Sequence, residues 1–102
     1  MFRVDTIKAG AIMNVDVYDT CALTEDGHRM HFDVFLPAGC GARCDEKAAD
    51  IARSWLHSIG INPDQIELEQ CHYCHSEAVN PEVSKQLVSQ GWFILPMEGC
   101  PA

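Results

Sequence analysis

Residues 30–36 read MHFDVFL, and this stretch decides the fold expected for the rest of the chain. Its apolar residues alternate with His31, Asp33 and Phe35, and such alternation is typical of a strand with one buried face. Residues 13–18, MNVDVY, alternate in the same way. Asp26-Gly27 lies between the two stretches and favours a turn with positive φ. The sequence therefore predicts an antiparallel hairpin.

A helix is predicted after this hairpin, over residues 46–59. Asp45 is suited to the N-cap position. Gly60 is suited to the position after the last turn, where Ile61 can fold back onto the helix as an apolar closure. The apolar residues of the segment recur at helical spacing and form one face: Ala48, Ala52, Trp55, Leu56 and Ile59.

The second half of the chain predicts a strand, a loop, a helix and a final strand. Residues 66–69 alternate as in a short strand, and residues 71–76 are expected to form a loop. Asn80-Pro81 marks a helix start, because asparagine caps well and proline fits the first turn; Gly91 marks the end of that helix. Residues 92–95 form an apolar run typical of a strand covered on both faces.

These elements predict a fold of the α+β class. We expect a single domain over residues 13–102, a β-β-α-β-α-β sandwich in which two helices pack on a four-stranded mixed sheet. Residues 1–12 are interpreted as an N-terminal extension or an additional edge segment. A chain of 102 residues is long enough for one hydrophobic core and too short for two.

Charge and composition limit the classes of partner. The chain has 7 Lys+Arg against 15 Asp+Glu, a net charge of −8, which disfavours nucleic acid and is compatible with a basic protein partner. No apolar run approaches the roughly 18 residues of a membrane helix, so no membrane partner is expected. Residues 1–5 do not resemble a signal peptide, and a cytoplasmic location with reduced cysteines is therefore expected.

The most specific chemical signal is Cys71-x-x-Cys74-His75, in a chain with six cysteines and five histidines. Two thiols at this spacing are typical of half a tetrahedral zinc site. Cys100, near the chain end, is a candidate third ligand, and His75 or His31 a candidate fourth. The best hypothesis is therefore a zinc-binding domain with a site built from Cys71, Cys74 and Cys100 together with one of these histidines.

Three other interpretations of the same motif stay open. Cys71 and Cys74 can form a thiol–disulfide redox pair, although the predicted helix cap at Asn80 lies too far away to activate either sulfur. Cys-x-x-Cys-His also matches the attachment motif of a c-type haem, which requires export. Finally, the cysteines can be structural residues of a protein-interaction module. Whether the protein is an enzyme, and what its oligomeric state is, cannot be read from these residues.

Two further groups of residues are weaker candidates. Cys40 and Cys44 lie just before a predicted helix whose N-terminus, with Arg43, favours a reactive thiolate at Cys44. Glycine-rich loops often carry incidental cysteines, however, and we favour that interpretation here. His31 and Asp33 share one strand face, where they can transfer protons or bind metal, but a solvated sheet face explains them more simply.

Several motifs, in order, resemble the small bacterial proteins grouped as domain of unknown function 2024. These motifs are VYDT at 17–20, DGH at 26–28, MHFDV at 30–34, WLxSIG at 55–60, CxxCHSE at 71–77, GWFI at 91–94 and MEGC at 97–100. The resemblance implies a compact α+β domain and supplies no activity. It includes Cys71, Cys74 and Cys100 with His31 and His75, and it leaves out the other three cysteines.

Overall fold

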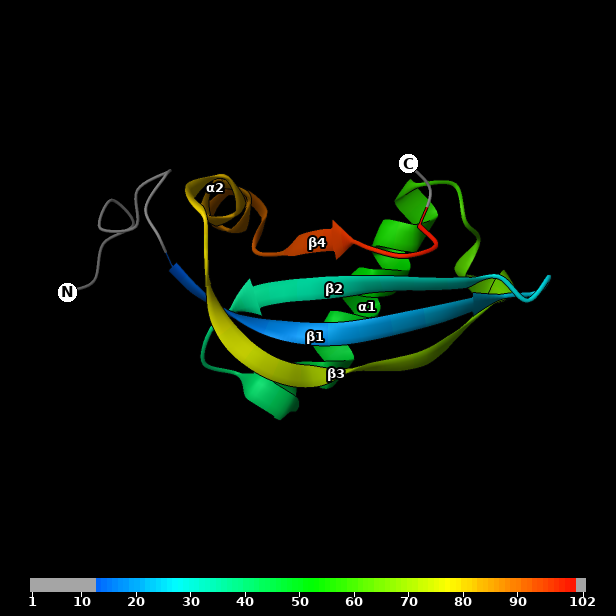
Figure 1. Ribbon diagram of the computed structural model, residues 1–102, viewed down its shortest axis with the longest axis horizontal. Helices are drawn as coiled ribbons and strands as arrows, with labels where there is room; N and C mark the ends of the chain where they lie inside the picture. The colour runs from blue at the N-terminus through cyan, green and yellow to red at the C-terminus, as the bar shows by residue number, and fades with distance from the viewer. Residues whose placement is uncertain (1–12, 101–102) are drawn as a thin grey trace.

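The strands and helices follow the predicted order (Figure 1). The computed structural model describes residues 13–100; residues 1–12, predicted to be an extension or edge segment, and residues 101–102 lie outside the described part. The elements in chain order are β1 (Met13–Thr24), β2 (Arg29–Pro37), the 3-10 turn η2 (Gly41–Cys44), α1 (Asp45–Ser58), the 3-10 turn η3 (Pro63–Gln65), β3 (Ile66–Val79), α2 (Pro81–Gln90) and β4 (Phe93–Pro96).

The four strands form one sheet in the order β3-β1-β2-β4, and every strand pair within residues 13–100 is antiparallel. The predicted hairpin of β1 and β2 is confirmed. The prediction of a mixed sheet was wrong, for a topological reason. Helix α1 connects β2 to β3, which run in the same direction, but β1 lies between them and pairs with both. The strands that run parallel are therefore never neighbours.

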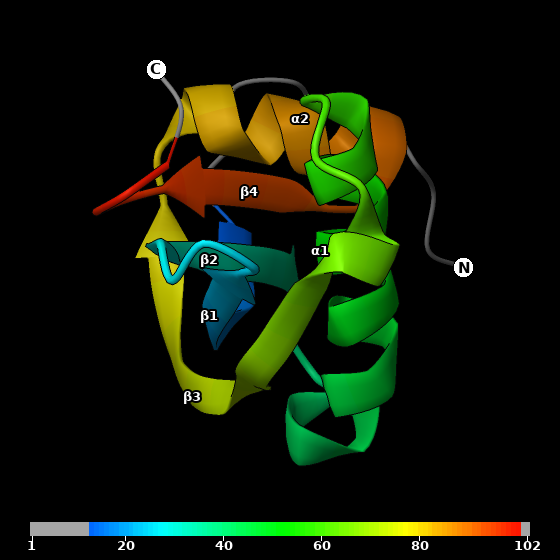
Figure 2. The same cartoon turned by 90° about the vertical axis from the view of Figure 1, so that its right-hand side faces the viewer.

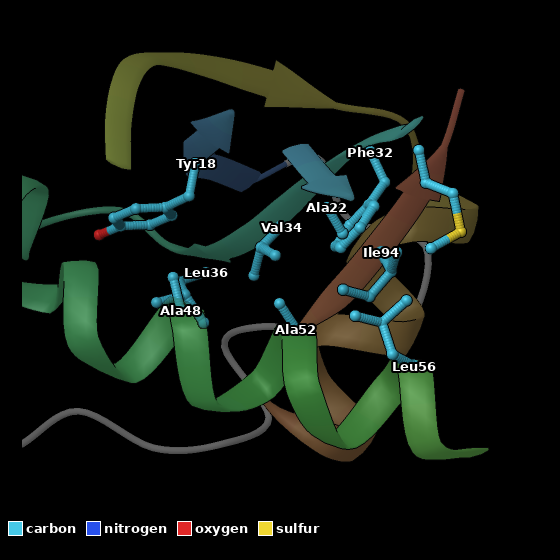
Figure 3. Packing of buried hydrophobic residues seen from close by; sticks show 10 residues of the cluster. Tyr18, Ala22, Phe32, Val34, Leu36, Ala48, Ala52, Leu56 and Ile94 are labelled. Carbon is cyan, nitrogen blue, oxygen red and sulfur yellow. The ribbon is translucent and has the colours of Figure 1, made fainter. Parts of the chain in front are cut away.

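Helix α1 covers one face of the sheet (Figures 1 and 2). Its Ala48, Ala52 and Leu56 are fully buried against the sheet, opposite Tyr18 and Phe32 (Figure 3). The small alanines let the helix backbone approach the sheet closely. Ile61 donates its backbone N–H to the Leu56 carbonyl at 2.9 Å and packs on the same cluster, so the predicted apolar closure is confirmed.

Helix α2 builds a second, smaller cluster on the opposite face. Leu87 packs with Val15, Val17, Phe35 and Val79 at the end of the sheet where β3 enters α2. The predicted helix start is confirmed, because Asn80 Oδ1 accepts the Val83 N–H at 2.9 Å. Helix α2 lies only at this end, at the left in Figure 1, so the rest of the sheet face opposite α1 has no helix over it.

Strand β3 is longer and less regular than expected. The predicted loop at 71–76 lies within this 14-residue strand, which pairs with β1 along its whole length. The register shifts twice, leaving Glu69 and Cys74 as extra residues that oppose no single residue of β1. Such bulges bend a strand and reset which face its side chains meet. The strand follows the strong curvature of the sheet in Figure 2 for this reason.

The loop between β2 and α1 is held by a buried carboxylate. Asp16 Oδ2 accepts the backbone N–H groups of Gly39, Cys40 and Gly41 at 3.1, 3.0 and 2.8 Å, and Ser76 Oγ donates to Oδ1 at 2.7 Å. Burial alone would raise the pKa of Asp16, but these hydrogen bonds outweigh it and hold the pKa below its ordinary value of 3.8. Asp16 thereby ties β1, β3 and the loop together.

The start of α1 differs from the prediction in its capping residue. Asp45 was expected to be the N-cap residue of α1, but Cys44 occupies that position without a side-chain hydrogen bond. The Asp45 carboxylate instead accepts the backbone N–H of Tyr73 at 2.9 Å, because β3 passes beside the helix start.

Neither helix of the described part combines the length and apolar character needed to span a bilayer.

We predict that Asp16→Ala lowers the free energy of unfolding at pH 7 by about 2–3 kcal/mol, the usual cost of losing hydrogen bonds to a charged group. A carboxylate with a depressed folded-state pKa stabilises the protein above its unfolded-state pKa, and that contribution disappears as the pH falls through the folded-state value. Urea unfolding at several pH values measures both effects. Asp64→Asn, which removes an exposed charge, is the control; equal losses in the two variants would contradict the role of Asp16.

Candidate functional site

Cys71 lies on β3 and points toward α1. It is the cross-strand partner of Thr20 on β1, and the Thr20 hydroxyl donates to the Cys71 sulfur at 3.3 Å. The side chain is partly buried against the core cluster beneath α1. Burial raises the pKa of the Cys71 thiol above its ordinary value, and the Thr20 hydrogen bond offsets this only in part. Cys71 is therefore a packing residue with a protonated thiol at neutral pH.

The bulge at Cys74 places the other two residues of the motif, Cys74 and His75, in different surroundings from Cys71. Cys74 is the extra residue of the bulge and is exposed to solvent. His75, the next residue, pairs with Val17 and so faces away from α1. Its Nε2 lies 3.1 Å from Glu77 Oε1. The motif thus places Cys71 and His75 on opposite faces of the sheet.

Cys100 lies at the far edge of the sheet from Cys71. The segment that carries it pairs with β2 through backbone hydrogen bonds of His31 to Met97 and Glu98, and the Cys100 thiol donates to the His31 carbonyl at 3.2 Å. Strands β1 and β2 stand between this segment and β3. At about 4.8 Å per strand spacing, these sulfurs cannot approach one ion at the roughly 2.3 Å that zinc requires.

The arrangement does not support the predicted zinc site. Within residues 13–100, no group of three or more His, Cys, Asp and Glu side chains is placed to hold a metal ion. A redox pair of Cys71 and Cys74 fits the geometry no better. Three residues of strand span about 10 Å, and a disulfide needs Cα atoms within about 7 Å. Both cysteines are free thiols.

The cysteines that do meet are Cys40 and Cys44, which the sequence interpretation had assigned to the background. They form a disulfide across the η2 turn, with Cα atoms 5.7 Å apart. The 3-10 turn at residues 41–44 brings them together, because it shortens the path between residues four apart. Their spacing was the available signal, but it did not show whether the chain between them would be extended or coiled.

The part of the sheet face opposite α1 that α2 does not cover carries a pair of opposed acids. Asp19 on β1 and Asp33 on β2 are direct cross-strand partners, and like charges in such positions destabilise a sheet. Asp19 accepts a hydrogen bond from the Gln70 side chain at 2.8 Å. In the described part of the chain, neither carboxylate forms a salt bridge with lysine or arginine. We call this surface, with its neighbours His31, His75 and Glu77, the open face.

Electrostatics on the open face disfavour the charge on Asp33. Partial burial raises the pKa of Asp33 most, and the nearby Asp19 and Glu77 raise it further, while His75 and His31 act in the opposite direction. The predicted sharing of one strand face by His31 and Asp33 is confirmed, because alternation along β2 places both opposite its core residues. The two residues therefore belong to a group drawn from three strands.

An apolar groove of about 440 Å³ adjoins these acids. Phe35, Val79, Val83, Phe93 and Leu95 line it, with Glu77 and Glu82 among its acidic residues. Leu95 is the cross-strand partner of Asp33, so the groove begins where the acid pair ends. The prediction that residues 92–95 are covered on both faces was wrong at this point, because Leu95 is 41% exposed.

Comparison with known proteins identifies the family. The chain belongs to the family described as Domain of unknown function (DUF2024), whose profile matches residues 13–97. A solved structure with the same fold is the NMR structure of protein NE1680 from Nitrosomonas europaea. It has 43% sequence identity and a TM-score of 0.71, and the match covers 87% of this chain and all of that one. No curated protein is significantly similar to this sequence.

We predict that the four free thiols react at clearly different rates in the folded protein. Cys74 is exposed and should be labelled first by a maleimide at pH 7. Cys71 is partly buried and its pKa is raised, so its labelling rate should be lower than that of Cys74 by about tenfold or more. Peptide mass spectrometry follows the labelling of each cysteine. The fast labelling should disappear in the Cys74→Ser variant and remain in the matched control, Cys100→Ser. Joint protection of Cys71 and Cys74 that a chelator releases would instead restore the metal interpretation.

We further predict that Asp33→Asn stabilises the protein at neutral pH by about 0.5 kcal/mol, because it removes one of two opposed charges. An acid whose folded-state pKa is raised destabilises the folded form when ionised, so the gain should disappear as the pH falls and the wild-type carboxyl takes up its proton. Urea unfolding measures the difference, with Asp64→Asn as the control. A loss of stability larger than that of the control would refute the opposed-charge interpretation.

Proposed function

We propose that this protein is a binding domain that holds a basic segment of a partner protein against its open face. The observation that carries the proposal is the opposed pair Asp19 and Asp33. This pair destabilises the folded sheet, and a lysine or arginine side chain placed over it would relieve the repulsion. Residues that reduce stability and have no structural role to balance the loss are characteristic of binding sites.

The motifs of the family resemblance support the same surface. Their acidic and histidine strand residues gather on the open face: Asp19, His31, Asp33, His75 and Glu77. The motif cysteines do not gather with them, since Cys71 packs beneath α1 and Cys100 lies at the far edge. These positions support the open face, and not the cysteine motif, as the proposed binding surface.

The groove beside the acids indicates the kind of segment that fits. Its lining is mostly apolar, and Glu77 and Glu82 add negative charge. A segment in which a lysine or arginine stands next to a leucine or similar side chain would place its cation over Asp33 and its apolar group against Leu95. The overall charge of −8 would favour the approach of such a basic partner.

The interpretation as a protein-interaction module is thus preferred to the zinc and Cys71–Cys74 redox hypotheses. Catalysis is not part of the proposal, because the open face has no enclosed cleft that would exclude water from a reaction. A cytoplasmic location remains a prediction from the sequence alone.

The test is an NMR titration of ¹⁵N-labelled protein with a synthetic Lys-Leu-Lys-Leu peptide, using Glu-Leu-Glu-Leu as the control peptide. We expect shifts at the amides of Asp33, His75 and Leu95 with the basic peptide only. Added salt should weaken them, because the contacts are exposed. Asp33→Asn should reduce affinity on the order of fivefold, the size typical of one exposed ion pair.

The matched control variant is Asp64→Asn, which removes the same charge from a residue far from the open face. Equal binding by the two variants, or shifts confined to other surfaces, would overturn the proposal. A titration with zinc chloride alone tests the competing cation. If zinc moves the same amides and the peptide does not, the open face is a metal site and the protein-binding proposal fails.

A further inference from the structure

We propose that Cys40 and Cys44 form a redox-active disulfide that exchanges with the thiols of a dithiol substrate. The bond lies at the start of α1, across the sheet from the open face, and the activity is separate from partner binding there. Two features carry the proposal. The loop is ordered by contacts other than the disulfide, and one of the two cysteines lines a shallow surface cavity.

Hydrogen bonds already fix the loop that contains both cysteines. Asp16 accepts three backbone N–H groups from residues 39–41, and the Tyr18 hydroxyl donates to the Gly41 carbonyl at 2.7 Å. A disulfide between residues only four apart closes a short loop and removes little entropy from the unfolded chain. Its contribution as a staple is therefore smaller than that of a disulfide closing a long loop. The same hydrogen bonds would keep the reduced thiols close together, so that the bond can open and close without unfolding.

The surroundings of the disulfide are open to solvent. A shallow cavity of about 290 Å³ is lined by Cys40 together with Gly39, Tyr73, Ser76 and Asp16, whose carboxylate is already engaged by the loop N–H groups and Ser76. Both cysteines are partly exposed, and Arg43 between them is exposed. The Arg43 guanidinium donates to the Gly39 carbonyl at 3.2 Å and so stays over the loop. This positive charge lies where an approaching thiolate would benefit from it.

The two sulfurs differ in their surroundings. Cys44 is the N-cap residue of a 14-residue helix, and the partial positive charge of such a terminus favours a thiolate. Asp45 and Glu46 in the first turn oppose this effect. The carboxylate of Asp45, however, is directed to the Tyr73 N–H on β3. Cys40 lacks a helix of this length at its own position, so Cys44 is the better leaving group and Cys40 the sulfur that is attacked.

The exchange then proceeds in two balanced steps. A thiolate of the substrate attacks Cys40 Sγ, the Cys40–Cys44 bond breaks, and Cys44 leaves as a thiolate that takes a proton from solvent. The second substrate thiol loses its proton and attacks the substrate sulfur of the mixed disulfide, which releases Cys40 as a thiolate. The substrate has lost two electrons and two protons to become a disulfide, and Cys40 and Cys44 have gained them.

The test is a redox titration of the intact protein in glutathione buffers, followed by acid quenching, alkylation and mass analysis of the 40–44 peptide. We expect a reversible transition between disulfide and dithiol, with the NMR spectrum of a folded protein at both ends. Dithiothreitol serves as the substrate probe. In the Cys40→Ser variant, the Cys44 thiol should react with iodoacetamide about tenfold faster than the exposed Cys74 thiol of the same chain.

Three results would overturn the proposal. The first is a pair that stays reduced in every glutathione buffer, which would mean that the disulfide does not form under relevant conditions. The second is unfolding on reduction, which would make the bond structural. The third is a Cys44 thiol that, in the Cys40→Ser variant, reacts no faster than Cys74. Comparison of wild type with Cys74→Ser, which keeps the disulfide pair, shows whether any exchange observed depends on a different cysteine.

Discussion

The alternation of side chains along β1 is the constraint on which the rest of the structure depends. This strand is paired on both sides, and its side chains point in turn toward α1 and toward the open face. Tyr18, Thr20 and Ala22 are fully buried beneath the helix, whereas Asp19 lies between them on the other face. The period of two therefore separates a covered face that stabilises the fold from the open face, which carries the acids.

The bulges of β3 extend this separation to the cysteine motif. Because Cys74 is an extra residue, Tyr73 remains opposite Tyr18 beneath α1 while His75 reaches the open face. In a regular strand Tyr73 and His75, two residues apart, would share one face; the bulge at Cys74 places them on opposite faces. The same curvature brings Ser76 to Asp16, so the carboxylate that orders the Cys40–Cys44 loop also fixes the end of β3. The open face and the disulfide loop are thus positioned by one central strand.

Local patterns predicted the elements, and long-range pairing determined the site. The hairpin turn, the Asn80 cap and the closure at Ile61 depend on residues close in sequence, and each was confirmed. The prediction of a loop at residues 71–76 was wrong because pairing with β1 imposes an extended backbone there, which no local propensity indicates. The opposition of Asp19 and Asp33 follows from the hairpin register, which is centred on Asp26. Counting outward from a two-residue Asp26-Gly27 turn pairs Asp19 with Val34 instead, so the predicted turn did not reveal the acid pair.

The proposed function depends on Asp33, which has no lysine or arginine partner within residues 13–100, and the titration of this carboxylate is the most direct test. Side-chain ¹³C NMR measures the pKa of Asp33 in the wild type and in Asp19→Asn. The account predicts a wild-type pKa above the ordinary 3.8, because burial and Asp19 disfavour the charge. It also predicts a lower value once Asp19 is neutral. A wild-type pKa at or below the ordinary value, or one that does not respond to Asp19→Asn, would show that the acids of the open face are already balanced.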